Sequence, residues 1–162
     1  MAHTVKAIPD GQRTITPHLV VKGGAEAMAF YEKAYGAIEC RRMAAPDGKL
    51  MHGDLQIGDS HVYLCEESPE WGQLSPLSLG GSPVSINIYT EDAEAFFARA
   101  IAAGATVKMP LMDMFWGDRF GKLADPFGHE WTVSQHLADY TPEEMAERGA
   151  AAMADAESGS CA

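Results

Sequence analysis

The feature that most constrains this chain is a repeat within its own sequence. The segment 29–34, Ala-Phe-Tyr-Glu-Lys-Ala, recurs at 95–100 as Ala-Phe-Phe-Ala-Arg-Ala, and a Gly-Ala pair follows each copy. Further matches continue in the same order and at nearly the same spacing. They are Gly53 with Gly121, His61 with His129, and Tyr63 with Trp131. Matches in one order at one spacing indicate that two similar units stand in tandem.

The pattern inside each half predicts one strand, one helix and three further strands. Apolar and β-branched runs bounded by turn residues are typical of strands, and apolar residues at helical spacing that end at a glycine are typical of helices. The predicted strands are 14–21, 37–43, 50–57 and 61–66, then 84–89, 106–112, 119–124 and 130–135. The predicted helices are 27–35, stopped by Gly36, and 93–103, capped by Asp92 and stopped by Gly104.

A βαβββ half cannot bury both faces of its own sheet, so the halves must pack on each other or on a partner. We therefore expect an α+β fold with two βαβββ modules forming a cupped, partly open barrel of mixed or antiparallel sheet. One face of each sheet takes its helix, and a pocket should form on the other. The expected divisions are 1–13, a disordered start; 14–67, the first module; 68–83, a Gly-, Ser- and Pro-rich linker; 84–137, the second module; and 138–162, a helix from Thr141 with a disordered tail from about Gly149.

Composition excludes several classes of protein. The formal charge of −11, from 23 acidic and 12 basic side chains, repels a phosphate backbone and predicts no nucleic-acid partner. Residues 1–13 carry no apolar run, and no stretch has the length of a bilayer span, so we expect no signal peptide and no membrane partner. Cys40, Cys65 and Cys161 lack metal-type spacing, which is typical of reduced thiols in the cytoplasm.

Six segments carry a resemblance to a known family: 15–21, 29–37, 51–55, 116–121, 125–131 and 141–145. On these segments the chain resembles the vicinal oxygen chelate superfamily, which includes glyoxalase I, extradiol dioxygenases, fosfomycin-resistance enzymes and bleomycin-binding proteins. Within it, the PhnB-like branch is the most similar. The resemblance covers residues 14–145 and implies a small-molecule cavity and a homodimer. It does not imply one activity, because one fold hosts many functions.

The resemblance also implies where a metal would be. Metal-using members take one ligand from the first and one from the last strand of each module, usually His, Glu or Gln. The corresponding residues are His18, Val84 or Ser85, Leu64 and Thr132. Only His18 is a usual ligand, and Glu66, two residues beyond Leu64 on the same face, is a possible second. Two ligands bind a metal weakly, so we expect no cofactor; zinc, nickel or manganese held by His18 and Glu66 is the alternative.

The apolar segment around Trp116 is unusual for a loop. As ligand-binding residues, Phe115 and Trp116 would stack on a flat ligand, and Arg119 would pair with its carboxylate or phosphate. The alternative has Trp116 at a module or dimer interface and Arg119 paired with Asp118 or Glu130, and the sequence does not decide between them.

His52 and Asp54 share one face of a predicted strand with Gln56. If that face is the concave one, His52 is a candidate general base. We expect the solvent face instead, because polar residues on a half-buried strand usually face water. His61 and His129, just after turns, are also expected at the surface.

The first hypothesis is therefore a metal-independent protein that binds a small organic molecule in the cupped cavity, with His18, Phe115, Trp116, Arg119 and Thr132 as candidate contacts. The alternative is a metal-dependent glyoxalase-like lyase or isomerase. A third hypothesis is a structural or regulatory partner with no small ligand.

Overall fold

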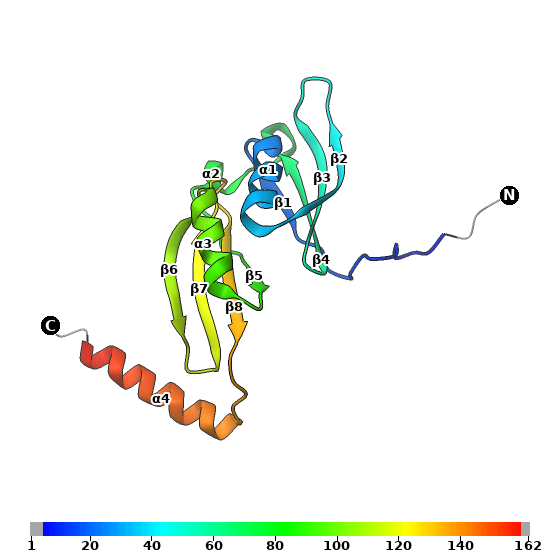
Figure 1. Ribbon diagram of the computed structural model, residues 1–162. Coiled ribbons are helices and arrows are strands. Elements are labelled where there is room, and N and C mark those ends of the chain that lie inside the picture. The colour runs from blue at the N-terminus through cyan, green and yellow to red at the C-terminus, as the bar shows by residue number, and fades with distance from the viewer. Residues whose placement is uncertain (1–4, 160–162) are drawn as a thin grey trace.

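A computed structural model describes residues 5–159 of the chain, with side chains described as far as residue 154 (Figure 1). The first module contains β1 (His18–Val21), α1 (Gly24–Tyr35), β2 (Ile38–Ala44), β3 (Leu50–Ile57) and β4 (Ser60–Glu66). The second contains β5 (Ser85–Tyr89), α3 (Ala93–Ala103), β6 (Thr106–Asp113), β7 (Asp118–Ala124) and β8 (Glu130–His136). Each half is a βαβββ unit, so the predicted α+β class is confirmed.

Each module forms its own four-stranded mixed sheet. The strand orders are β1-β4-β3-β2 and β5-β8-β7-β6, and the first strand of each module is parallel to the last. β1 is shorter than the predicted 14–21, since Pro17 has no N–H to donate and pairing starts at His18. The two sheets are not hydrogen-bonded to each other, so they do not close into one barrel.

The two modules meet through their helices, α1 and α3, which contact each other between the sheets (Figure 1). The core runs through this junction. Tyr31 and Tyr35 of α1 contact Trp131 of β8 with ring centroids 5.5 and 4.8 Å apart, and Tyr35 stacks on Phe96 of α3 at 5.5 Å. Each helix covers one face of its sheet. The opposite face, called the open face below, carries no helix of its own module.

The last strand of each module shows that the repeat is not evenly spaced. Gly53 pairs with Leu64, eleven residues on, whereas Gly121 pairs with Val133, twelve residues on. A shift of one residue moves a side chain to the other face of a strand. Thr132 therefore corresponds to Tyr63, and the pairing with Leu64 suggested by constant spacing is wrong.

The ends and the linker differ from the sequence prediction. The linker, predicted only as a Gly-, Ser- and Pro-rich connection, contains a short 3₁₀ helix (Pro69–Trp71) and α2 (Pro76–Leu79). At the C-terminus, α4 runs over Pro142–Gly159 and so continues past Gly149, where the sequence predicts a disordered tail. Its alanine-rich sequence favours a helix. Thr141 and Glu144 cap its start reciprocally, as the sequence predicts, with hydrogen bonds of 2.8 and 3.2 Å. Residues 1–4 and 160–162, which include His3 and Cys161, lie outside the described residues.

Candidate functional site

Three ring side chains from three strands gather on the open face of the first sheet. His18 of β1 lies 6.1 Å, centroid to centroid, from both His52 of β3 and Tyr63 of β4. His52 and Tyr63 are 5.0 Å apart. The Tyr63 hydroxyl donates a hydrogen bond to the side chain of Gln12, at 2.9 Å. His52 therefore belongs to a cluster on the open face of the first sheet, which no helix of its module covers.

The environment of this cluster keeps His18 neutral. Burial lowers the pKa of His18, and the nearby His52 lowers it further, because a second positive charge would be repelled. A neutral imidazole has one nitrogen that donates and one that accepts. The cluster thus presents hydrogen-bonding groups of both kinds beside an aromatic ring.

A hydrogen-bonded histidine–aspartate pair lies next to these rings on the same face. The Asp54 carboxylate of β3 and the Nδ1 of His61 on β4 are 2.6 Å apart. The side chains of Asp54 and His61 are each 13% exposed, so His61 is not the surface residue that its place after a turn suggests. His129 is not at the surface either, since its Nε2 is 3.0 Å from the carbonyl oxygen of Val20 in the other module.

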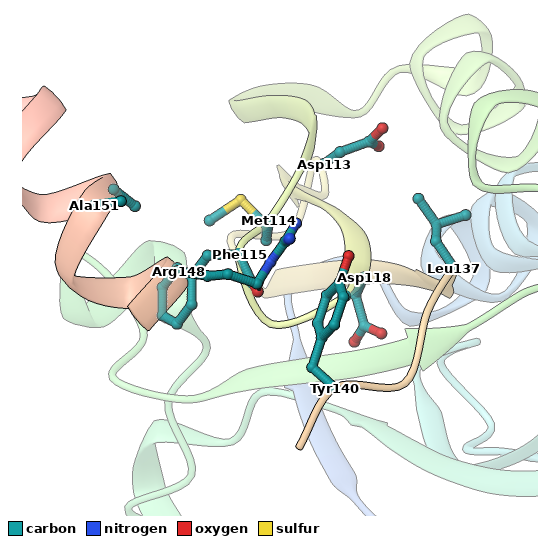
Figure 2. A pocket seen from close by; sticks show the side chains of 10 residues that line it. Asp113, Met114, Phe115, Asp118, Leu137, Tyr140, Arg148 and Ala151 are labelled. Carbon is teal, nitrogen blue, oxygen red and sulfur yellow. The ribbon is translucent and has the colours of Figure 1, made fainter. Parts of the chain in front are cut away.

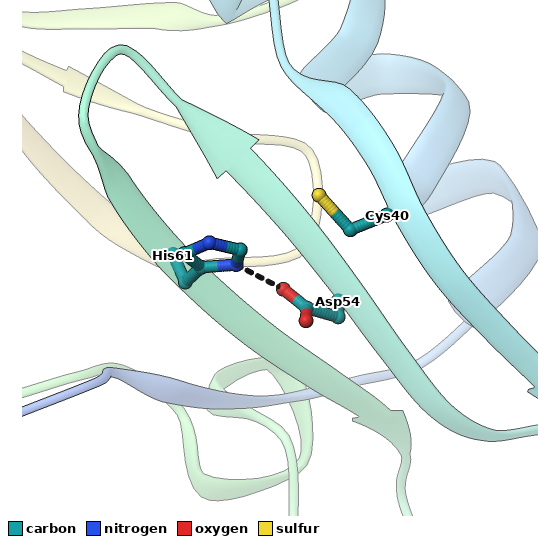
Figure 3. Close-up of side chains that lie close together, drawn as sticks. All are labelled: Cys40, Asp54 and His61. Carbon is teal, nitrogen blue, oxygen red and sulfur yellow. Dashed lines mark hydrogen bonds and ion pairs between the residues drawn. The ribbon is translucent and has the colours of Figure 1, made fainter. Parts of the chain in front are cut away.

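Figure 3 shows Cys40 of β2 beside this pair. A sulfur, a carboxylate oxygen and an imidazole nitrogen from Cys40, Asp54 and His61 all lie within 4.8 Å of one another.

The open face of the second sheet is polar at its centre. Oδ1 of Asn87 on β5 accepts hydrogen bonds from the hydroxyls of Thr132 and Ser134 on β8, at 2.7 and 2.8 Å. Thr132, a predicted ligand contact, therefore has its hydroxyl engaged within the sheet. The strand register makes Asn87, and not Val84 or Ser85, the counterpart of His18, because Asn87 pairs with Thr132 as His18 pairs with Tyr63.

The predicted aromatic residues lie at the turn between β6 and β7. Trp116 packs edge-on against Phe115 and Phe120, with centroids 5.0 and 5.7 Å apart. Phe115 lines a cavity of about 540 Å³ between this turn and α4 (Figure 2). Arg148 of α4 donates to the Phe115 carbonyl oxygen at 3.2 Å and stacks over the Tyr140 ring. Trp116 does not lie between the two modules.

Arg119 is already paired with acidic side chains. Its guanidinium donates to Asp113 at 2.7 and 3.2 Å and to Glu94 of α3 at 2.7 Å. These partners place it on the helix side of the second sheet, away from Trp116 and Phe120. The alternative interpretation correctly predicted that Arg119 pairs with acidic side chains. The partners are Asp113 and Glu94, and not Asp118 or Glu130.

Glu66 also lies on the helix side of its sheet. Its two carboxylate oxygens accept the backbone N–H groups of Gly23 and Gly24 at 2.8 and 2.7 Å. This carboxylate satisfies donors at the start of α1. The Glu66 carboxylate is thus already engaged by two backbone donors, although Glu66 and His18 both line a cavity of about 300 Å³.

The residues at the family's metal positions do not fit a divalent ion. With the register corrected, these positions hold His18, Tyr63, Asn87 and Thr132. Only one of them is an imidazole, and the Asn87 oxygen is occupied by two hydroxyls. A metal held at these positions would lack the nitrogen, thiolate or carboxylate ligands that transition metals prefer.

A larger cavity, of about 690 Å³, lies between the modules. Ile86 and Ile88 of β5 line it together with Tyr35, Phe96 and Trp131. The Tyr35 hydroxyl is buried and has no hydrogen-bond partner among the described residues. A third cavity, of about 300 Å³, is lined by His18 and Cys65. Trp116, Arg119 and Thr132 line none of these three cavities.

Comparison with known proteins now identifies the family. Residues 3–133 match the model of the Glyoxalase/Bleomycin resistance protein/Dioxygenase superfamily. The chain belongs to this superfamily. Among the helices of residues 5–159, none is long and apolar enough to cross a bilayer.

The matches to similar proteins cover most of the chain. The uncharacterized protein Rv0887c of Mycobacterium tuberculosis is 44% identical over 134 residues, which is 81% of this chain and 79% of that protein. The structure of the Arabidopsis thaliana protein At5g48480 matches with a TM-score of 0.62 and 28% identity, covering 75% of this chain and 98% of that one. TioX from Micromonospora sp. ML1 matches with a TM-score of 0.62 and 26% identity, covering 77% and 99%.

The predicted PhnB-like branch has looser support. A PhnB protein from Bacillus cereus, described as a putative 3-demethylubiquinone-9 3-methyltransferase, matches with a TM-score of 0.59 and 18% identity over 76% of this chain and 99% of that one. At that identity the match shows a shared fold.

Proposed function

We propose that the protein binds a small organic molecule on the open face of its first sheet, at His18, His52 and Tyr63. The observation that supports this most directly is the convergence of three ring side chains from β1, β3 and β4 on a face that no helix of the module covers. None of the three belongs to the buried apolar core. Rings with polar edges can stack on an organic molecule and also hydrogen-bond to it.

The cluster suits a neutral or positively charged ligand. The lowered pKa of His18 favours its neutral form, so the imidazole adds no positive charge. The acidic Asp54 lies next to the cluster. The formal charge of the chain, −11, adds a field that attracts cations and repels anions. A flat molecule with a hydrogen-bonding edge could stack on Tyr63 and bond to the two imidazoles.

A second copy of the chain would complete the binding site. The open faces carry apolar side chains that remain in water in one chain: Met43 beside His52 is 51% exposed, and Met112 beside Phe120 is 50% exposed. Two similar sheets, each with one uncovered face, favour a two-fold dimer in which the second module of one copy covers the first module of the other. The ligand would then lie between two sheets.

The proposed function requires no metal at the family's positions. Those positions offer one imidazole and no carboxylate, so a metal-dependent lyase or isomerase reaction there has less support than binding alone.

The test is a thermal-shift screen of the full-length protein with organic compounds that include flat cations. Any compound that binds only the folded form raises the melting temperature. Compounds that stabilise the protein are then tested on His52→Ala and Tyr63→Ala, with His129→Gln as the matched control away from the open face. We expect the stabilisation to disappear in the first two variants and to remain in the control. A compound that stabilises all three variants equally contradicts the proposed site.

A further inference from the structure

Cys40, Asp54 and His61 come from three neighbouring strands and converge on the open face of the first sheet (Figure 3). Their donor atoms lie within 4.8 Å of one another. These residues are distinct from the family's metal positions, which include none of the three. From this convergence we propose that Cys40, Asp54 and His61 bind a transition-metal ion of the zinc type.

The backbone explains how three side chains reach one point. In the pairing of β2 with β3, the register shifts between Glu39 and Arg41, so Cys40 is the extra residue of a bulge. A bulge redirects the side chain it inserts. Asp54 and His61 lie diagonally across the β3–β4 pair, where Asp54 pairs with Tyr63 and His61 with Gln56. Diagonal neighbours on one face of a sheet are within reach of each other.

The Asp54 carboxylate is the second observation that points to a ligand. The side chain of Asp54 is only 13% exposed, and among residues 5–159 its one side-chain hydrogen bond is the one to His61. A carboxylate can accept about four hydrogen bonds. A buried charge with so few partners is costly unless a cation neutralises it, and a metal ion would do so more fully than one imidazole.

The donor set selects the kind of ion. Thiolate and imidazole favour zinc and similar transition metals over calcium or magnesium, which prefer oxygen ligands alone. Zinc binds sulfur at about 2.3 Å and nitrogen or oxygen at about 2.0–2.2 Å, so the donors around one tetrahedral ion lie roughly 3.3–3.8 Å apart. Reaching this arrangement requires donors that are now up to 4.8 Å apart to approach by about 1–1.5 Å, and the Asp54 and His61 atoms, now 2.6 Å apart, to separate by about 0.7 Å. Cys40 lies on the edge strand β2, where it can adjust.

Binding would exchange protons for the ion. The proton shared by His61 and Asp54 would move to the other ring nitrogen or to solvent, and the Cys40 thiol would release its proton to solvent, because imidazole binds a metal in its neutral form and cysteine as the thiolate. Three protein ligands leave a fourth position open to water or a ligand. No redox step is involved.

The experiment uses the full-length protein, treated with chelator and reductant and then titrated with Co²⁺ and with Zn²⁺. We expect one ion per chain and the ultraviolet charge-transfer absorption of a cobalt–thiolate bond. Cys40→Ser should abolish that absorption and weaken zinc binding by about 100-fold, and His61→Gln should weaken zinc binding similarly. Circular dichroism checks that each variant folds. Cys40→Ser is the decisive variant, since Cys40 is exposed and contributes nothing to the core.

Two controls locate the ion. Cys65→Ser removes the other described thiol, and His18→Gln removes the imidazole at the family's metal position; both should bind zinc with the affinity of the unaltered protein. The proposal is overturned if the unaltered protein binds no cobalt, if Cys40→Ser keeps the thiolate absorption, or if His18→Gln abolishes binding. The site does not depend on the proposed organic ligand, because the titrations contain none.

Discussion

The carboxylate of Asp125 in the second module accepts a hydrogen bond from the hydroxyl of Tyr31 in the first, at 2.6 Å. The same carboxylate accepts the Trp131 indole N–H at 2.8 Å and the backbone N–H groups of Phe127 and His129, both at 2.9 Å. Burial and the nearby Asp125 charge raise the pKa of Tyr31, so its hydroxyl keeps its proton. This group joins the two modules, and thereby fixes where each open face points.

Replacing Tyr31 with Phe should lower the free energy of unfolding by about 1.5–3 kcal/mol, since it removes a buried hydrogen bond to a charged acceptor. Asp125→Ala should cost more, because it leaves several buried donors without a partner. Urea unfolding measures both. Tyr140→Phe is the control, expected within about 0.5 kcal/mol of the unaltered protein. Equal stability of Tyr31→Phe and the control would show that the bond does not hold the modules together.

Glu66 should act on stability and not on metal binding. Glu66→Ala removes the acceptor for two N–H groups at the start of α1 and should cost about 1–2 kcal/mol in urea unfolding. Glu70→Ala, at an exposed position, is the control and should change stability little. Loss of zinc binding in Glu66→Ala, with stability unchanged, would reverse the role assigned to this residue.

His136 should make stability depend on pH. Hydrogen bonds to Asp118 and Asp139 raise its pKa above the ordinary value of about 6.5. The folded protein therefore favours the protonated form. This stabilisation is complete below the ordinary pKa and is lost as the pH rises through the raised one. His136→Gln should lower the melting temperature at pH near 5.5 and have less effect near pH 8.5. Equal effects at both pH values would contradict the assignment.

Glu67 should make stability depend on pH in the opposite direction to His136, because its pKa is lowered and not raised. Hydrogen bonds from Ser78 and Ser75 lower its pKa to about 2. The resulting stability is present above the ordinary pKa and is lost as the pH falls through the lowered one. Glu67→Gln should therefore reduce the loss of stability between about pH 4.5 and pH 2. Asp47→Asn, at an exposed turn, serves as the control. An unchanged acid profile in Glu67→Gln would exclude this role.

The elements of the fold could be predicted from sequence because their signals are local. The helix from Gly24 to Tyr35 and the strand from Leu50 to Ile57 follow from apolar spacing and from glycines at their ends. The register of the last strands could not be predicted, since it depends on one additional residue between β7 and β8. That residue decides whether Thr132 corresponds to Leu64 or to Tyr63.

The candidate site was less accessible to sequence reasoning because its contacts are long-range. Nothing local indicates that Glu94 reaches Arg119, or that Tyr63 faces His18. The alternation of His52 and Asp54 correctly placed them on one face but could not show which face. The role of Cys40 depends on a bulge, for which the sequence carries no clear signal.

The position of a bound compound tests the account most directly. A crystal structure of the full-length protein with the compound that raises its melting temperature most should show the compound in contact with His18, His52 and Tyr63, beneath the second module of another copy. A compound bound instead in the cavity between the modules, beside Tyr35 and Ile86, would contradict the proposed site, as would a single chain whose open faces stay in solvent when the compound is bound.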